Sequence, residues 1–256
     1  EINCWDVSLI TDMEDLFRDK TTFNDDISSW DVSNVTNMYA MFMNAGSFNQ
    51  DIGSWDVSSA TNMPYVFYNA GSFNQDISSW DVSNAEVLHQ FFRGAASFNQ
   101  DISSWDVSSA YGMEAMFRSA ISFNQDISSW DVSSVTMMDD IFLDASGLSD
   151  ENKCAIHTSF SSNENWSYDW SENQDCAGDC YGASIVDNCG VCDSDLSNND
   201  TTCAQDECGL WSGDGSTCSE VSLSFGAVTS DSVEILYTST GSVSGFQFDV
   251  SGLDIA

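Results

Sequence analysis

The residues best suited to chemistry lie in a Cys- and Asp-rich segment of the second half of the sequence. Oxygen-bearing side chains occur there as Asp193-x-Asp195-x-x-Asn198-x-Asp200. Such oxygens can wrap a hard cation, as in EF-hand loops, although the spacing differs from theirs. We therefore expect a Ca²⁺ site, the alternative being a solvated acidic loop. The candidate ligands are Asp187, Asp193, Asp195, Asn198, Asp200 and Asp214.

The same segment holds most of the nine cysteines. So many cysteines in a segment poor in apolar residues indicate disulfides and an oxidising, extracellular compartment. Cys189-x-x-Cys192 has the spacing of a zinc-ligand pair, but no second pair of Cys or His follows, which favours disulfides over zinc. The disulfide candidates are Cys154, Cys176, Cys180, Cys189, Cys192, Cys203, Cys208 and Cys218.

Two further sets of acids recur every 25 residues. One set, in which a Ser follows two positions later, is Asp6, Asp31, Asp56, Asp81, Asp106 and Asp131; the other is Glu1, Asp26, Asp51, Asp76, Asp101 and Asp126. They suit either a row of Ca²⁺- or mineral-binding oxygens or carboxylates that each accept backbone N–H groups in their own turn. One acid per repeat supplies few of the roughly 6–8 oxygens that Ca²⁺ takes, which favours the structural interpretation.

Catalytic constellations are not evident. His89 and His157 lie far apart, neither has a motif partner, and Ser is too abundant to nominate a nucleophile. We therefore predict that the protein is not an enzyme and uses no organic cofactor.

The element that must position these residues is a repeat. Trp and Phe each recur at an interval of 25 residues without any insertion, a period within the range of leucine-rich-repeat-like solenoids. The two columns are Trp5, Trp30, Trp55, Trp80, Trp105 and Trp130, and Phe17, Phe42, Phe67, Phe92, Phe117 and Phe142. The fold expected is an α/β repeat solenoid of six 25-residue rungs, in which each rung buries its apolar face only by stacking on the next.

Within one repeat the apolar period changes. Trp30 and Val32 alternate with polar residues in SSWDVS, which predicts a strand. In TNMYAMFMNA the apolar residues from Met38 to Ala45 fall at i, i+3, i+4 and i+7, which predicts a short helix. The Asn after each returning Phe should form an amide ladder that bonds the backbone of the bend, from Asn24 to Asn124.

Cys4 and Cys154 occupy the same position six repeats apart. At the spacing of strands they would lie roughly 29 Å apart, whereas a disulfide spans about 4.4–6.8 Å between Cα atoms. They cannot pair within one stack. Cys4 is then a free or packed thiol, a partner of a cysteine outside this sequence, or an intersubunit disulfide that locks a head-to-tail stack.

The repeats FNQDISSWDVSNVTNMYAMF and FNQDISSWDVSSVTMMDDIF resemble the BspA-type repeats of secreted and surface-anchored proteins, relatives of leucine-rich repeats. The likeness covers about residues 1–150. It implies a structural or adhesive role at a cell surface and carries no catalytic residues. The CGVC segment resembles short Cys/Asp-rich extracellular modules and, more loosely, thrombospondin type 3 calcium repeats.

Three domains are expected from these patterns. Residues 1–157 would form the solenoid, ending in a degenerate seventh rung at 148–157 that caps it, and residues 158–218 the disulfide module. Residues 219–256 alternate as strands in VSLSF, SVEILYTS and GFQFDVSGLDIA, which resemble the start of a cohesin-like β-sandwich. The chain begins at Glu1 with neither Met nor a signal peptide, as expected of a mature product or a fragment.

The charge bounds the partners. With 41 acidic and 5 basic residues the formal net charge is −36, which excludes nucleic acid and anionic membranes because both repel such a surface. No apolar run approaches the roughly 20 residues of a membrane span. We expect a non-catalytic extracellular or cell-surface protein that assembles end to end as a head-to-tail homopolymer, stabilised by Ca²⁺ and disulfides. The alternative is an adhesin that binds glycan, mineral or protein through the flat Ser/Asp face.

Overall fold

The computed structural model describes residues 2–186, 192–193, 221–228 and 233–239. The chain divides into two compact units, Glu1–Gly182 and Ala183–Ala256, and each is considered by itself. The helices of the first unit are η1 (Ile2–Cys4), α1 (Asp150–Phe160) and η2 (Ser171–Asn173). Among the described residues, no helix has the length and apolar content that crossing a bilayer requires.

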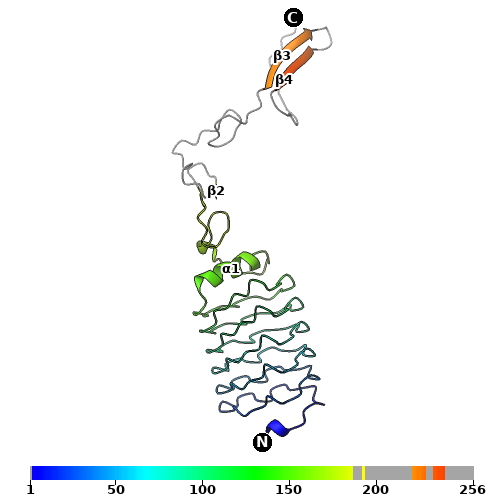
Figure 1. Ribbon diagram of the computed structural model, residues 1–256, viewed down its shortest axis with the longest axis vertical. Coiled ribbons are helices and arrows are strands. Elements are labelled where there is room, and N and C mark those ends of the chain that lie inside the picture. Colours follow the sequence, from blue (N-terminus) through cyan, green and yellow to red (C-terminus); the bar gives the residue numbers. More distant parts are fainter. Residues whose placement is uncertain (1, 187–191, 194–220, 229–232, 240–256) are drawn as a thin grey trace. The chain divides into compact units, whose positions relative to one another are not determined.

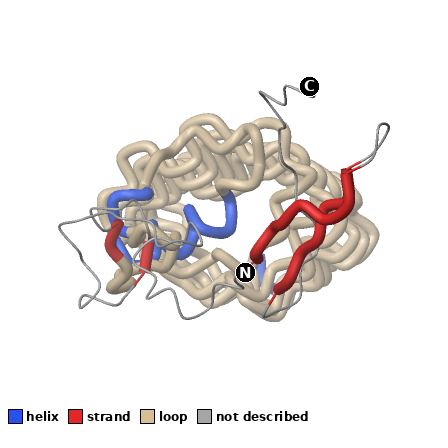
Figure 2. Tube along the Cα trace, turned by 90° about the horizontal axis from the view of Figure 1, so that it is seen from above, coloured by secondary structure: helices blue, strands red, loops and turns tan. Residues whose placement is uncertain are grey.

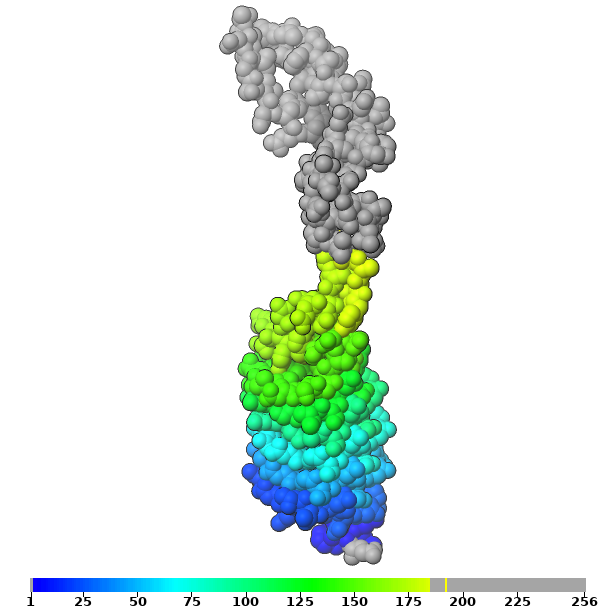
Figure 3. All heavy atoms as spheres, turned by 90° about the vertical axis from the view of Figure 1, so that its left-hand side faces the viewer, coloured from blue at the N-terminus to red at the C-terminus, as the bar shows by residue number. Residues whose placement is uncertain are grey.

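Residues 2–149 form a stack of 25-residue repeats, here called rungs (Figures 1 and 3). Seen from above, the rungs superimpose as a closed, flattened coil made almost wholly of turns and loops (Figure 2). Successive rungs are joined by parallel bridges at one position of the repeat. The bridges run Asp12–Asn37–Asn62–Val87–Gly112–Met137.

The predicted short helix does not form in any rung, and the backbone makes a chain of turns instead. Alternate N–H groups in the segment bond inside the rung, as Met41 N–H does to the Met38 carbonyl (3.1 Å). The others bond the next rung, as Phe42 N–H does to the Val66 carbonyl (3.0 Å). Left-handed φ angles at Ala40 and Asn44 break the helical path. The helical spacing of apolar residues was therefore real, but inter-rung bonding replaces the helix.

The predicted strand at SSWDVS is also wrong as a regular element, since the structure has turns on either side of an extended stretch there. Its alternation survives: Trp30 and Val32 are buried, while Asp31 is exposed. Three consecutive residues whose side chains alternate are enough to point two side chains inward and one outward. The pattern therefore predicted correctly which side chains point inward and which point outward, but it did not predict the secondary structure.

The core is one continuous set of apolar columns. The Phe42 ring stacks on Phe67 (centroids 5.5 Å apart) and on Phe48 of its own rung (4.0 Å). The indoles of Trp55 and Trp80 stack at 6.4 Å with an interplanar angle of 4°. Full burial of each such side chain contributes on the order of 1.5–3 kcal/mol, so stacking is the main source of stability.

Helix α1 ends the stack. Ser149 caps it by accepting the Asn152 N–H (3.3 Å). The helix buries its own side chains Ile156 and Phe160. The predicted seventh rung at 148–157 is therefore helical from Asp150 onward. The first unit also extends beyond the predicted boundary at 157, to Gly182.

The second unit contains two described strand pairs. β1 (Ile185–Val186) pairs with β2 (Cys192–Asp193), and β3 (Val221–Val228) pairs with β4 (Val233–Ser239), both antiparallel. The β3–β4 register shifts between Phe225 and Val228. These strands occupy the segments predicted from VSLSF and SVEILYTS, whereas GFQFDVSGLDIA lies outside the described residues.

Candidate functional site

The first acid column forms a hydrogen-bonded turn in every rung. Asp31 Oδ1 accepts the Ser33 backbone N–H at 3.1 Å and the Ser33 hydroxyl at 2.6 Å. Asp56, Asp81 and Asp106 repeat this pair of bonds with the Ser two residues later, and Asp131 accepts the Ser133 N–H at 3.0 Å. One carboxylate oxygen in each rung is therefore committed to the fold.

These bonds outweigh the repulsion along the column. The pKa of Asp31 is lowered, first by the Ser33 hydroxyl and then by its N–H, although the carboxylates of Asp56 and Asp6 oppose the shift. The pKa values of Asp106 and Asp131 are lowered for the same two reasons. The ionised column is thus stabilised locally, without a bound cation being required to explain it.

The second acid column has the same kind of role. Asp26 Oδ1 accepts the Ser28 N–H at 2.9 Å, and Asp51 Oδ1 accepts the Gly53 N–H at 3.0 Å. The column continues with N–H groups bonded by Asp76, Asp101 and Asp126. Glu1 lies outside the described residues.

The amide and indole columns tie one rung to the next. Asn49 N–H donates to Asn24 Oδ1 at 2.8 Å, and this bond recurs in each rung until Ser149 N–H donates to Asn124 Oδ1. Trp80 Nε1–H donates to the Ile52 carbonyl of the preceding rung at 3.0 Å. The recurring polar residues therefore bond the backbone, as predicted for the amides.

No group of three or more His, Cys, Asp or Glu side chains within the described residues could hold a metal ion. Of the six Ca²⁺ candidates, only Asp193 belongs to a described element, as the last residue of β2. Asp187, Asp195, Asn198, Asp200 and Asp214 lie outside the described residues, so the predicted Ca²⁺ site is not tested.

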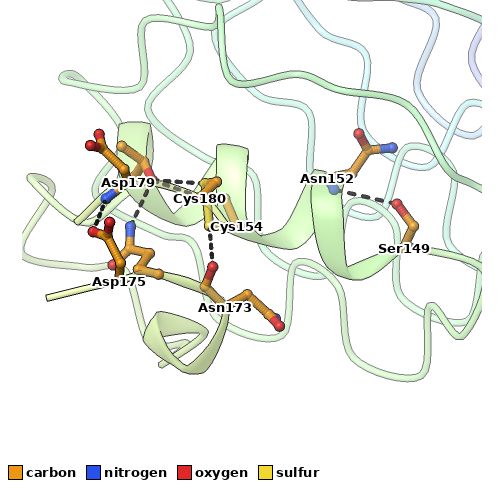
Figure 4. Close-up of a disulfide and its surroundings, with 9 residues drawn as sticks. Ser149, Asn152, Cys154, Asn173, Asp175, Asp179 and Cys180 are labelled. Atoms are coloured by element: carbon orange, nitrogen blue, oxygen red, sulfur yellow. Dashed lines mark hydrogen bonds between the residues drawn. A yellow bond between two sulfur atoms is a disulfide. The ribbon is translucent and has the colours of Figure 1, made fainter. Parts of the chain in front are cut away.

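Cys154 of α1 forms a disulfide with Cys180, with Cα atoms 5.7 Å apart (Figure 4). Beside it, the Asp175 N–H donates to the Asp179 carbonyl (2.9 Å) and the Asp179 N–H returns to Asp175 Oδ1 (2.9 Å). The disulfide thereby fastens a short loop against α1. Cys176 and Cys192 are also disulfide-bonded, while Cys189, Cys203, Cys208 and Cys218 lie outside the described residues.

The two histidines occupy separate structural sites. His89 Nδ1 accepts the Glu114 N–H at 3.1 Å, and burial lowers the pKa of the ring. His157 Nδ1 accepts the Trp166 indole N–H at 3.0 Å. Each ring therefore serves a local contact, and the structure does not bring the two together.

A hollow of about 460 Å³ lies between the last rung and the residues after α1. Its walls include Trp130, Asp131, Asn163 and Glu164. Asp131 already bonds Ser133, and the Asn163 amide donates to the carbonyls of Val132 and Val135. The lining offers carboxylate and amide oxygens together with the hydroxyls of Ser133, Thr136, Ser159 and Ser162, and contains no His, Cys or Lys side chain.

A family model described as "Mycoplasma protein of unknown function, DUF285" matches residues 1–95 and 78–177. The chain belongs to this family. DUF285 is a BspA-like repeat family, so the resemblance read from the repeats holds at the level of the family. The match ends before the CGVC segment, whose likeness to extracellular modules it does not address. No curated protein and no solved structure gave a match.

The two ends of the DUF285 stack differ. In the first rung Trp5 is 61% exposed, whereas the equivalent Trp30 is 5% exposed, and Ile10 and Leu16 also face outward at positions that are buried in the second rung. Cys4 is a free, exposed thiol in the same rung. At the other end, the Phe142 N–H donates to the Tyr168 hydroxyl at 2.9 Å, beneath Trp166 and Trp170. Among the described residues, the face of the first rung is exposed and that of the last rung is covered.

Sequence reasoning missed one feature of the DUF285 repeats. It compared the columns that recur and gave little weight to positions where the rungs differ, which lie beside the parallel bridges. Three tyrosines and an arginine are in contact there: Tyr39, Tyr65, Tyr68 and Arg93. The signal was available, because the basic residues Arg18, Arg93 and Arg118 share one position of the repeat.

Proposed function

We propose that this chain is a non-catalytic scaffold protein of the extracellular surface, which associates end-on through its first rung. The observation that carries the proposal is the open first rung. Its Trp5 and Leu16 occupy positions that are buried by a neighbouring rung elsewhere, as Trp30 and Met41 are. An exposed apolar end of this kind is typical of a surface that binds another surface.

The backbone of the first rung supports the same role. In inner rungs the carbonyls of Asn37, Tyr39 and Met41 accept N–H groups from the rung before. The equivalent carbonyls of the first rung receive no hydrogen bond from any described residue. They belong to Asp12, Glu14 and Leu16. A structured surface that covers this edge, whether a preceding segment of the chain or a partner, would supply N–H donors as well as apolar side chains, as another repeat edge does.

The covered C-terminal end bears on how copies would assemble. Stacking one copy's first rung on another's last rung would require the residues after α1 to move, because Tyr168 already bonds Phe142. This favours association through the first rung over a head-to-tail homopolymer of unmodified stacks. A disulfide through Cys4 would strengthen such an association, and non-reducing electrophoresis would show it as a reductant-sensitive dimer.

Sedimentation of the full chain over a range of concentrations tests the proposal. The sedimentation coefficient should rise with concentration, and more so at high salt, which screens the net charge of −36. Trp5→Ser with Leu16→Ser should abolish the rise, whereas Ile121→Ser, which alters an exposed apolar residue elsewhere, should not. A wild-type chain that stays monomeric at every concentration and salt would overturn the proposal.

We further propose an extracellular location and Ca²⁺ binding within residues 187–214. The Cys154–Cys180 disulfide supports an oxidising compartment. Ca²⁺ titrated into the full chain should release or absorb heat, and EDTA should lower the melting temperature. Unchanged melting and no heat of binding would contradict the Ca²⁺ proposal while leaving the scaffold role standing.

A further inference from the structure

Four side chains form a continuous surface across the second, third and fourth rungs, here called the Tyr–Arg patch: Tyr39, Tyr65, Tyr68 and Arg93. The rings of Tyr39 and Tyr65 meet edge to face with centroids 5.4 Å apart, and Tyr65 and Tyr68 lie 6.1 Å apart. The guanidinium of Arg93 lies 5.3 Å from the centre of the Tyr68 ring. All four side chains are partly exposed, so the patch is accessible.

The backbone fixes this arrangement. Tyr65 has a left-handed φ of 63°, and its N–H donates to the His89 carbonyl of the next rung at 2.9 Å. A left-handed tyrosine is costly without a compensating structure. Here the inter-rung bond holds it, and the ring is thereby placed between Tyr39 and Tyr68.

The rung segments that carry the patch are almost free of acids. Glu86 is the one acidic residue in these three segments, which are residues 36–46, 61–71 and 86–96. In the whole chain, 41 of the 256 residues are acidic. The equivalent segments of the first and last rungs are rich in them, with Asp12, Glu14, Asp15, Asp19, Asp139, Asp140 and Asp144. Beyond the patch, Glu114 of the fifth rung is close enough to raise the pKa of Tyr65, after the larger effects of burial and Tyr39.

Arg93 differs from the two arginines at the same repeat position. Arg18 pairs with Asp15 at 3.1 Å, and Arg118 pairs with Asp140 at 2.9 Å. Arg93 donates to the Gln90 amide oxygen at 2.7 Å and has no carboxylate within ion-pair distance among the described residues. Its charge is therefore available to an external anion.

We propose that the Tyr–Arg patch binds an oligosaccharide that carries carboxylates. The planar fork of a guanidinium matches a carboxylate, and tyrosine rings offer rigid, amphipathic contact area. Side-chain amides at the edge of the patch can form hydrogen bonds with the hydroxyl groups of the sugar. One such amide is that of Asn62, which donates to the Asn37 side-chain oxygen at 2.8 Å. The scarcity of carboxylates around the patch reduces the repulsion of an anionic ligand but does not favour the binding of a neutral sugar. This favours an acidic oligosaccharide over a neutral one. The patch is independent of the first rung.

The test uses the full chain and hyaluronan octasaccharide, in which glucuronate alternates with N-acetylglucosamine, at about 0.15 M salt to limit long-range repulsion. Its carboxyl-reduced form is the matched neutral probe. Calorimetry should show binding of the octasaccharide and about tenfold weaker binding of the reduced form, as expected when one charge-assisted contact is lost. Arg93→Gln should weaken binding of the acidic probe to the level of the reduced one.

Two matched controls separate the patch from general effects. Arg118→Gln removes an arginine at the same repeat position, and Tyr111→Ala removes an exposed tyrosine outside the patch; both should bind like wild type. Tyr68→Ala should lose binding while the melting temperature shows that the chain is folded. Absence of wild-type binding, equal binding of the two probes, or equal losses in Arg93→Gln and Arg118→Gln would each overturn the proposal.

Discussion

The first and last rungs of the stack can be compared residue by residue, because the same 25-residue pattern builds both. At the first rung Leu16 is 43% exposed, whereas at the last Ile141 is fully buried. Phe17 packs only on rings of its own and the following rung, while Phe142 also contacts Trp166, Tyr168 and Trp170. The difference shows that a rung owes much of its burial to what lies beyond it.

The largest effect should come from removing the aromatic ring at each end. Phe142→Ala should lower the free energy of unfolding by about 3–5 kcal/mol, since it leaves a cavity between the fifth rung and the cap. Phe17→Ala should cost less than about 2 kcal/mol, because that ring is only half-buried. Urea unfolding followed by tryptophan fluorescence measures both. Equal costs would mean that the ends are energetically alike despite their different burial.

The disulfide that fastens the cap should have the next largest effect. Cys154→Ala with Cys180→Ala should lower the free energy of unfolding by about 2–4 kcal/mol, because the bond closes a loop in the unfolded chain. Cys4→Ala, which alters the free thiol at the open end, should leave the urea midpoint unchanged. A loss of stability in Cys4→Ala would show that the Cys4 side chain contributes to the stability of the folded chain.

The hydrogen bond that closes the last rung can be removed alone. Tyr168→Phe should cost about 1–3 kcal/mol, because the Phe142 N–H is left without its acceptor. Tyr111→Phe, at an exposed tyrosine, is the control and should cost little. Hydrogen exchange gives the more specific result: the Phe142 amide should lose protection in Tyr168→Phe and keep it in the control.

The smallest effect should be the same in the first rung and in an inner rung. The Ser8 hydroxyl bonds Asp6 within one turn, as the Ser108 hydroxyl bonds Asp106, and the pKa of each Asp is lowered by that hydroxyl first. Their stabilisation is present above the ordinary value of 3.8 and is lost as the pH falls through the lowered folded-state pKa.

Ser8→Ala and Ser108→Ala should therefore lower the melting temperature slightly and equally at neutral pH. As the pH falls through the lowered folded-state pKa and the carboxylates are protonated, the melting temperatures of both variants should converge on that of the wild type. Comparing each variant with wild type at the same pH removes the effect of the net charge. A larger effect at Ser108 would show that these turns also depend on the neighbouring rungs.

Much of the stack followed from the sequence because the repeat makes each position visible six times. The inward columns of Trp and Phe, the amide ladder from Asn24 and the turn-bound carboxylates were all predicted from residue type and period. The prediction of a short helix was wrong, because the same i, i+3, i+4 spacing suits a chain of turns. What chose between them was inter-rung hydrogen bonding, such as Phe42 N–H to Val66, which a period within one repeat does not encode.

The cap and the Tyr–Arg patch were harder to foresee for another reason. Tyr168 and Trp170 cover Phe142 from a segment that has no repeat, so no column pointed to their partners. In the patch, Tyr68 and Arg93 come from consecutive rungs and the same repeat position, where Arg occurs in three of the six rungs and Tyr in one. Periodicity identifies what recurs and gives no weight to what is different.

The alternating hydrogen bonds of the turn segment also have a consequence for synthesis on the ribosome. The N–H groups of Met38, Ala40 and Phe42 find their acceptors only in the following rung. A growing chain, made from the N-terminus, would always present these donors at its newest edge, and each added rung would satisfy one set while exposing another. At the last rung, Tyr168 supplies the acceptor of the Phe142 N–H. Until then, each newly added rung leaves unpaired N–H donors at the edge of the nascent stack. The Phe142 N–H is therefore paired only when the residues after α1 emerge, and not when the last repeat is complete.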